Sequence, residues 1–174
     1  MKKVDVYVLV SVVVSLNKRP KLEQLSELAG LSVSVIHRSL KQLKKSKLLV
    51  ELMSGDEPNF RNIEEFLLCG FPYVFPEEKG SLVRGFATGI DGSSLKKDFV
   101  ESEYPAVWAH YAGNIKGFEV EPLHKAIPEL IAKGKMNQEL YELLALLDVL
   151  RLGQKREIEA AKNHIRKMLA KYEQ

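Results

Sequence analysis

The chain has 174 residues, of which 45% are hydrophobic and 28% charged, and its formal net charge is +3 at pH 7. This composition is ordinary for a soluble globular protein, and no segment is of low complexity. The single cysteine, Cys69, excludes an intrachain disulfide and a cysteine-based metal site, and it fits the reducing environment of the cytoplasm.

The charge is distributed unevenly along the chain. The first fifty residues contain ten Lys and Arg against three acidic residues, a net charge of +7, and the remainder carries −4. A basic module joined to a mildly acidic one is typical of proteins that bind polyanions. A lysine-rich solvated helix face gives the same count, so charge alone does not decide between the two.

The first predicted element is an apolar run at residues 4–16. Two lysines precede it, as in a secretory signal, but Asp5 interrupts its start and no small-x-small cleavage site follows. It is also shorter than the roughly 20 residues that span a bilayer, so we expect no membrane segment. Its seven valines suit a strand as well as a helix. The helical pattern that follows favours a buried helix.

Residues 21–47 predict two helices joined by a short turn. Leucines at helical spacing define the first helix, and Gly30 suits the left-handed position that ends it. Ser32 is a good N-cap for the second helix, 32–46, whose apolar stripe consists of Ile36, Leu40 and Leu43. Two helices joined by a turn of about three residues are typical of the DNA-binding helix-turn-helix.

The opposite face of helix 32–46 carries the predicted DNA contacts. Arg38 can hydrogen-bond guanine, Ser34 and His37 can donate to bases or phosphates, and the nearby valine methyl groups can meet thymine methyls. The lysines further along the helix would reach phosphates. The complete set of predicted DNA-binding residues is Ser32, Val33, Ser34, Val35, His37, Arg38, Lys41, Lys44, Lys45 and Arg61.

A short β-hairpin is predicted after this helix. Residues 48–53 have the pattern of a strand, 54–58 that of a turn, and 59–61 can return as a second strand. This hairpin would form a wing that carries Arg61 as its only cation.

The combined pattern resembles the winged helix-turn-helix of MarR-type bacterial regulators over roughly residues 4–62. The matching positions are a leucine and Ser32, three variable positions, an aliphatic residue, His37-Arg38, two stripe leucines and then Leu48-Leu49. The resemblance implies docking of helix 32–46 in the major groove. The family commonly has a serine where this chain has His37, which leaves the base preference open.

The middle of the chain predicts little regular structure. Residues 62–70 form a short helix capped by Asn62, with Cys69 packed as a small hydrophobe. Residues 71–105 are rich in glycine and proline, and their aromatic residues begin with the alternation of an extended segment at 71–75. Residues 106–122 predict a β-hairpin anchored by Trp108. The glycines match no phosphate-binding loop, and His110 and His124 lack partners at ligand spacing.

The C-terminal third is predicted to be helical. A helix from Pro122 should bend or split at Pro128, and two longer helices should follow at 137–153 and 154–172. Their apolar stripes are expected to form the core and also a homodimer interface, because paired half-sites on DNA require a two-fold axis. Asp148, Arg151 and Arg156 are interpreted as a surface ion-pair cluster rather than a partner-binding patch.

Two stretches, 65–85 and 140–165, also resemble a bacterial regulator group with an N-terminal helix-turn-helix that is associated with toxin–antitoxin or defence loci. This resemblance implies an antitoxin-like repressor.

The sequence thus predicts a mainly α fold with small β elements: a winged helix-turn-helix at 1–62, an extended and β-hairpin region at 63–121, and a helical region at 122–174. We find no catalytic constellation, metal cluster or cofactor motif, and therefore expect no enzyme and no cofactor. The predicted function is that of a cytoplasmic, sequence-specific transcriptional regulator, most simply a repressor, that binds double-stranded DNA. The alternative is an antitoxin-like module that neutralises a protein partner through the C-terminal half.

Overall fold

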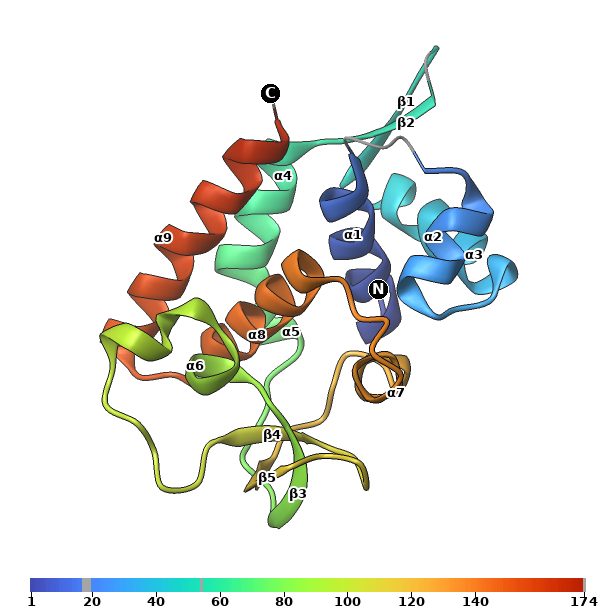
Figure 1. Cartoon of the computed structure of the whole chain (residues 1–174). Coiled ribbons are helices and arrows are strands. Elements are labelled where there is room, and N and C mark those ends of the chain that lie inside the picture. Colours follow the sequence, from blue (N-terminus) through green and yellow to red (C-terminus); the bar gives the residue numbers. More distant parts are fainter. Residues whose placement is uncertain (17–19, 54, 174) are drawn as a thin grey trace.

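The computed structural model describes residues 1–16, 20–53 and 55–173. It is mainly helical, with 59% helix and 14% strand, which confirms the predicted class (Figure 1). Within these ranges, none of the helices combines the length and apolarity needed to cross a bilayer. In chain order the elements are α1 (Lys3–Ser15), α2 (Leu22–Ala29), α3 (Val33–Lys45), β1 (Leu49–Leu52), β2 (Gly55–Pro58), α4 (Phe60–Glu65), a π-helical turn (Phe66–Gly70), α5 (Phe71–Val74), β3 (Leu82–Ala87), α6 (Gly89–Gly92), a 3-10 helix (Ser94–Asp98), β4 (Ala106–Ala109), β5 (Ile115–Glu119), α7 (Ala126–Ala132), α8 (Gln138–Leu152) and α9 (Lys155–Tyr172).

The valine-rich run is the central helix α1. It is surrounded by α2, α3, α8 and α9, so valines on all its sides are buried, and this packing outweighs their strand propensity. Asp5 lies in the first turn and accepts hydrogen bonds from the Lys2 backbone N–H (2.7 Å) and from the Ser39 hydroxyl of α3 (2.8 Å). The acidic residue that interrupts the apolar run therefore joins α1 to α3.

The turn between α2 and α3 has the predicted local structure. Gly30 adopts the left-handed conformation with φ 61°, and the N–H of Leu31 closes the turn on the Ser26 carbonyl at 3.1 Å. Ser32 occupies the N-cap position, but its hydroxyl lies 3.1 Å from that of Ser34 and does not cap the helix. In the predicted stripe, Ile36 and Leu43 are buried and Leu40 is partly buried.

The hairpin β1–β2 follows α3, but its second strand lies earlier than predicted. The register pairs Leu49 with Pro58 and Leu52 with Gly55, so residues 59–61 are not a strand. Instead, the Asn59 side chain accepts from the Asn62 N–H at 3.2 Å and caps α4. The capping preference of asparagine thus begins a helix at Phe60.

Residues 60–74 form nearly continuous helix rather than a short helix and an extended segment. The chain passes from α4 through the π-helical turn into α5, so Asn62 does not begin the helix and Gly70 does not end it. Phe71 and Phe75 are both buried, because their spacing of four residues matches one side of a helix. Cys69 is exposed, and its predicted burial is therefore wrong.

The strands β3, β4 and β5 form a small sheet that differs from the predicted hairpin. Both β4 and β5 pair antiparallel with β3, and they lie parallel to each other. The strands approach so closely that a Cβ on Gly85 would overlap the Trp108 carbonyl group. The hairpin prediction failed because it omitted β3, whose segment was assigned to an extended loop.

The C-terminal helices complete the core. Pro128 lies in the first turn of α7, where its missing N–H costs no helical hydrogen bond, so it does not split the helix. Asn137 caps α8 by accepting from the Leu140 N–H at 2.9 Å, as predicted. The apolar faces of α8 and α9 are buried against α1 and against each other. They are used within the monomer and provide no free stripe for a dimer interface.

Candidate nucleic-acid interface

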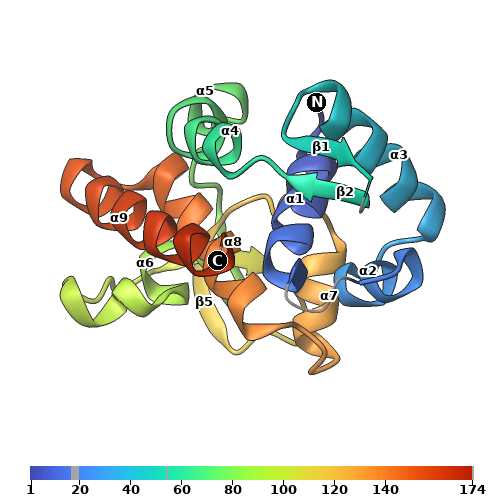
Figure 2. The same ribbon diagram turned by 90° about the horizontal axis from the view of Figure 1, so that it is seen from above.

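The candidate interface is the outer face of α3. The helix is held from behind by α1, α2 and β1, and viewed from above it lies on the opposite side of α1 from α9 (Figure 2). Ile36 and Leu43 have no exposed surface and fix the rotation of the helix about its axis. The buried hydrogen bond from Ser39 to Asp5 adds a directional constraint. The remaining side of α3 is therefore held toward solvent.

The structure brings most predicted DNA-binding residues onto this face. Among the predicted residues of α3 and its N-cap, Val35 and Lys44 are partly buried, and the others are exposed. The exposed set is Ser32, Val33, Ser34, His37, Arg38, Lys41 and Lys45. In the described part of the chain, the four charged or ionisable members of this set make no hydrogen bond or ion pair with the protein. They are available to a ligand.

Lys44 departs from the prediction that it is free to contact phosphate. Its Nζ lies 3.2 Å from Oδ1 of Asp56 and 3.7 Å from Oε2 of Glu51, both on the hairpin. The hydrogen bond with Asp56 contributes most to raising the pKa of Lys44 above its ordinary value. The positive charge of Lys44 is therefore already compensated by carboxylates of the protein itself.

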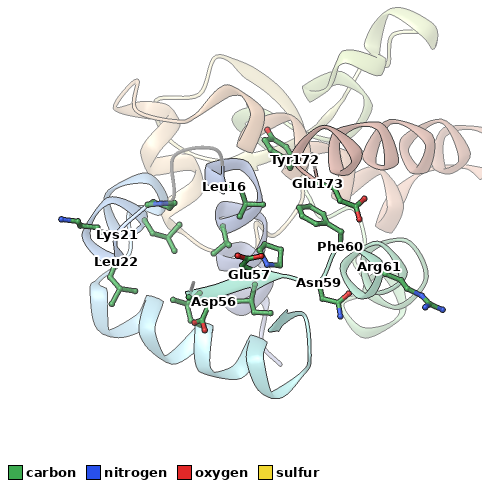
Figure 3. Close-up of a pocket in the computed structure, with 17 residues that line it drawn as sticks. Leu16, Lys21, Leu22, Asp56, Glu57, Asn59, Phe60, Arg61, Tyr172 and Glu173 are labelled. Atoms are coloured by element: carbon green, nitrogen blue, oxygen red, sulfur yellow. The ribbon is translucent and has the colours of Figure 1, made fainter. Parts of the chain in front are cut away.

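Arg61 is not part of a wing. It lies on α4, is exposed, and its side chain points away from the hairpin (Figure 3). The segment from Leu48 to Asn59, which contains the hairpin, has three acidic residues and no Lys, Arg or His. The predicted role of Arg61 as the cation of the wing is therefore wrong, because Asn59 begins a helix before Arg61 is reached.

A groove of about 950 Å³ lies beside the hairpin, between the three-helix module α1–α3 and the end of α9 (Figure 3). Leu16, Leu22 and Leu40 contribute apolar surface, and Asp56, Arg61 and Glu173 lie on its lining as charged groups. The Tyr172 hydroxyl in this groove donates to Glu139 and is already satisfied. The groove separates α3 from the C-terminal end of the chain.

A buried polar cluster in the C-terminal half was not predicted. Asp148 is 2% exposed and accepts from Trp108 Nε1 (2.8 Å) and Thr88 Oγ1 (2.7 Å). Arg151, whose side chain has no exposed surface, donates to the same carboxylate at 2.6 Å and to Glu77 at 3.1 Å. Burial raises the pKa of Asp148, while Arg151 and the two hydrogen bonds lower it. The surface ion-pair interpretation is wrong for these two residues, and Arg156 lies exposed elsewhere on α9.

The signal for this cluster was present in the sequence. Residues 143–152 are apolar except for Asp148 and Arg151, and two opposite charges within such a run favour a buried pair over a surface pair. The partners Thr88 and Trp108 are distant in sequence and gave no signal.

The histidines do not form a metal centre in the described residues. His110 lies 3.2 Å from Glu129, and no group of three or more His, Cys, Asp or Glu side chains converges within the described ranges.

Comparisons of the chain with protein-family models, with curated proteins and with solved structures find no match.

Proposed function

We propose that the chain is a sequence-specific DNA-binding transcriptional regulator, most simply a repressor. In this proposal α1–α3 and the β1–β2 hairpin form a winged helix-turn-helix, and α3 enters the major groove of duplex DNA. The observation that carries the proposal is the exposure of Ser34, His37, Arg38 and Lys41 on one side of α3, uncovered by the C-terminal half.

The dimensions and chemistry of this face fit a duplex. An α-helix fits the width of the major groove, and the N-terminal part of a recognition helix meets the base edges. Arg38 can donate two hydrogen bonds to guanine, and His37 and Ser34 can donate to bases or phosphates. Lys41 and Lys45 lie nearer the C-terminal end, where side chains reach the phosphate backbone.

The two-fold symmetry of many operators makes a homodimer part of this proposal. The faces of α8 and α9 that were expected to form its interface are occupied by the core. A dimer would have to use another surface, or the two copies would have to meet only on DNA. The mass of the protein, measured by light scattering with and without a duplex carrying two half-sites, distinguishes these cases.

The test of the proposed function is binding of the full chain to duplex DNA from the region upstream of its own gene. Fluorescence anisotropy would compare this duplex with a scrambled one at about 50 mM and 200 mM salt. We expect tighter binding to the upstream duplex and a steep loss of affinity with salt, because phosphate contacts release counterions. Absence of binding at the lower salt concentration, or binding that ignores salt, contradicts the proposal.

A further inference from the structure

The hairpin β1–β2 is acidic, and negative charge disfavours contact with the phosphates of DNA. Glu51 and Asp56 stand directly opposite each other in the antiparallel register, where two like charges destabilise a pair of strands. Lys44 lies between them, within 3.7 Å and 3.2 Å of the two carboxylates. The lysine therefore offsets the repulsion within the hairpin and ties it to α3.

This arrangement places carboxylates where a DNA phosphate would otherwise bind. Lys44 lies in the last turn of α3, on the helix that carries Lys41 and Lys45, which form no ion pair within the described residues. The Glu51 side chain is 77% exposed, so its negative charge also acts on molecules that approach from solvent. A phosphate approaching this end of α3 meets two acidic groups and an occupied lysine.

We infer that the carboxylates of the hairpin compete with DNA phosphates for Lys44. By occupying this lysine, Glu51 and Asp56 lower the affinity of α3 for DNA of any sequence. The inference rests on the proposed function of α3. Phosphate contacts supply most of the affinity for non-specific DNA, whereas contacts with base edges supply discrimination. Weakening a phosphate contact therefore lowers the affinity for specific and non-specific DNA by similar factors, and discrimination is left to the contacts that α3 makes with base edges.

The decisive variant is E51Q/D56N, which removes both charges while retaining side chains of nearly the same shape. We expect it to bind a short scrambled duplex about three- to tenfold more tightly at low salt, with a salt dependence steeper by about one released counterion. The matched control is E78Q/E103Q, which changes net charge equally. Glu78 and Glu103 are exposed and precede β3 and β4 in the chain. These strands lie at the far end of the molecule from the hairpin (Figure 1).

A second variant tests whether Lys44 is the cation that is released. K44Q alone should weaken binding less than Lys41→Gln, because Lys44 is already occupied. Added to E51Q/D56N, it should remove most of the gain. Thermal unfolding of each variant checks that the hairpin remains folded.

The outcomes distinguish failure of this inference from failure of the proposed function. If neither the natural chain nor E51Q/D56N binds any duplex at low salt, the proposed function fails and this inference fails with it. If the natural chain binds but E51Q/D56N is no tighter, or gains no more than the control, only the inference is overturned. A gain of undiminished size in the K44Q background also overturns it.

Discussion

Two charged clusters of this protein each pair a basic side chain with carboxylates, but in opposite environments. Lys44 meets Glu51 and Asp56 at the surface, where the lysine side chain is 33% and the glutamate 77% exposed. Arg151 meets Asp148 in the core, where the two side chains are 0% and 3% exposed. An exposed pair contributes little to stability and its charges act on approaching ligands, whereas each member of a buried pair depends on the other. Under the proposed function the first cluster acts on DNA binding, whereas the second acts on folding.

The buried cluster also joins distant parts of the chain. Arg151 donates to Glu77 and to the Glu121 carbonyl, both at 3.1 Å, and Lys3 of α1 lies 3.3 Å from the same Glu77. Asp148 accepts from groups on β4 and next to β3. The cluster thus connects α8 with the small sheet and with the helix that supports α3.

The largest expected effect is a loss of stability when the buried cluster is broken. Asp148→Ala should lower the free energy of unfolding by about 3–5 kcal/mol, because Arg151 and the Trp108 N–H lose their buried acceptor. Urea denaturation measures this loss. The control is Glu159→Ala, which removes an exposed partner of Lys162 at 3.5 Å and should cost less than about 1 kcal/mol. Equal losses for the two variants would show that burial does not decide how much such an ion pair contributes to stability.

The next effect is a change in DNA affinity that leaves the free energy of unfolding unchanged. Arg38→Ala should weaken binding to the preferred duplex by about 1–3 kcal/mol and relax preference at one base pair. The free energy of unfolding should not change, because Arg38 is exposed and makes no contact that α3 needs. The matched control is Arg156→Ala, an exposed arginine on α9. An equal loss of affinity for matched and scrambled duplexes would show that Arg38 does not contact base edges.

A smaller effect compares two lysines three residues apart on α3. Lys41→Ala should weaken binding to all sequences alike and reduce the salt slope by about one, as expected for a single phosphate contact. Lys44→Ala should change the slope less, because Asp56 and Glu51 already neutralise that lysine. Titrations over a range of salt concentrations measure both slopes. A larger change for Lys44 than for Lys41 would contradict the assignment of the hairpin as a competitor.

The smallest effect is a pH dependence at the junction of α1 with the C-terminal half. His124 stacks against Tyr7, with ring centroids 6.2 Å apart, and its Nδ1 accepts from the Ala126 N–H at 3.1 Å. Burial, followed by the charge of Lys125, lowers the pKa of His124 below its ordinary value of 6.5. The unfolded chain therefore takes up a proton before the folded one does. The neutral ring therefore stabilises the folded protein above pH 6.5. This contribution is lost as the pH falls from 6.5 through the lowered pKa of the folded protein.

His124→Asn tests this sign, because asparagine retains an acceptor and does not titrate. The melting temperature of the natural chain should fall slightly more than that of the variant between about pH 7.5 and pH 5.5. Parallel decreases in the two proteins would exclude a contribution from His124.

Several local signals in the sequence were reliable where one helix or one turn decides the outcome, although the Ser32 and Asn62 caps were not. Gly30, Asn137 and the stripe of α3 all behave as predicted, because they depend on contacts within four residues or on the conformation of a single residue. The same kind of signal failed at residues 71–75. There the aromatic residues fit an alternating strand pattern and a helical spacing of four, and only the surrounding core selects the helix.

The sequence by itself determined that α3 would be amphipathic, with aliphatic residues on one side and His37, Arg38 and Lys41 on the other, because side chains three and four apart share a helix face. Only the tertiary structure decided which charges remain available. Asp148 meets Trp108 and Thr88 across 40 and 60 residues of chain, and Lys44 meets a hairpin whose register places two acids opposite each other. Such pairings depend on how separate elements pack, and no pattern within one element specifies them.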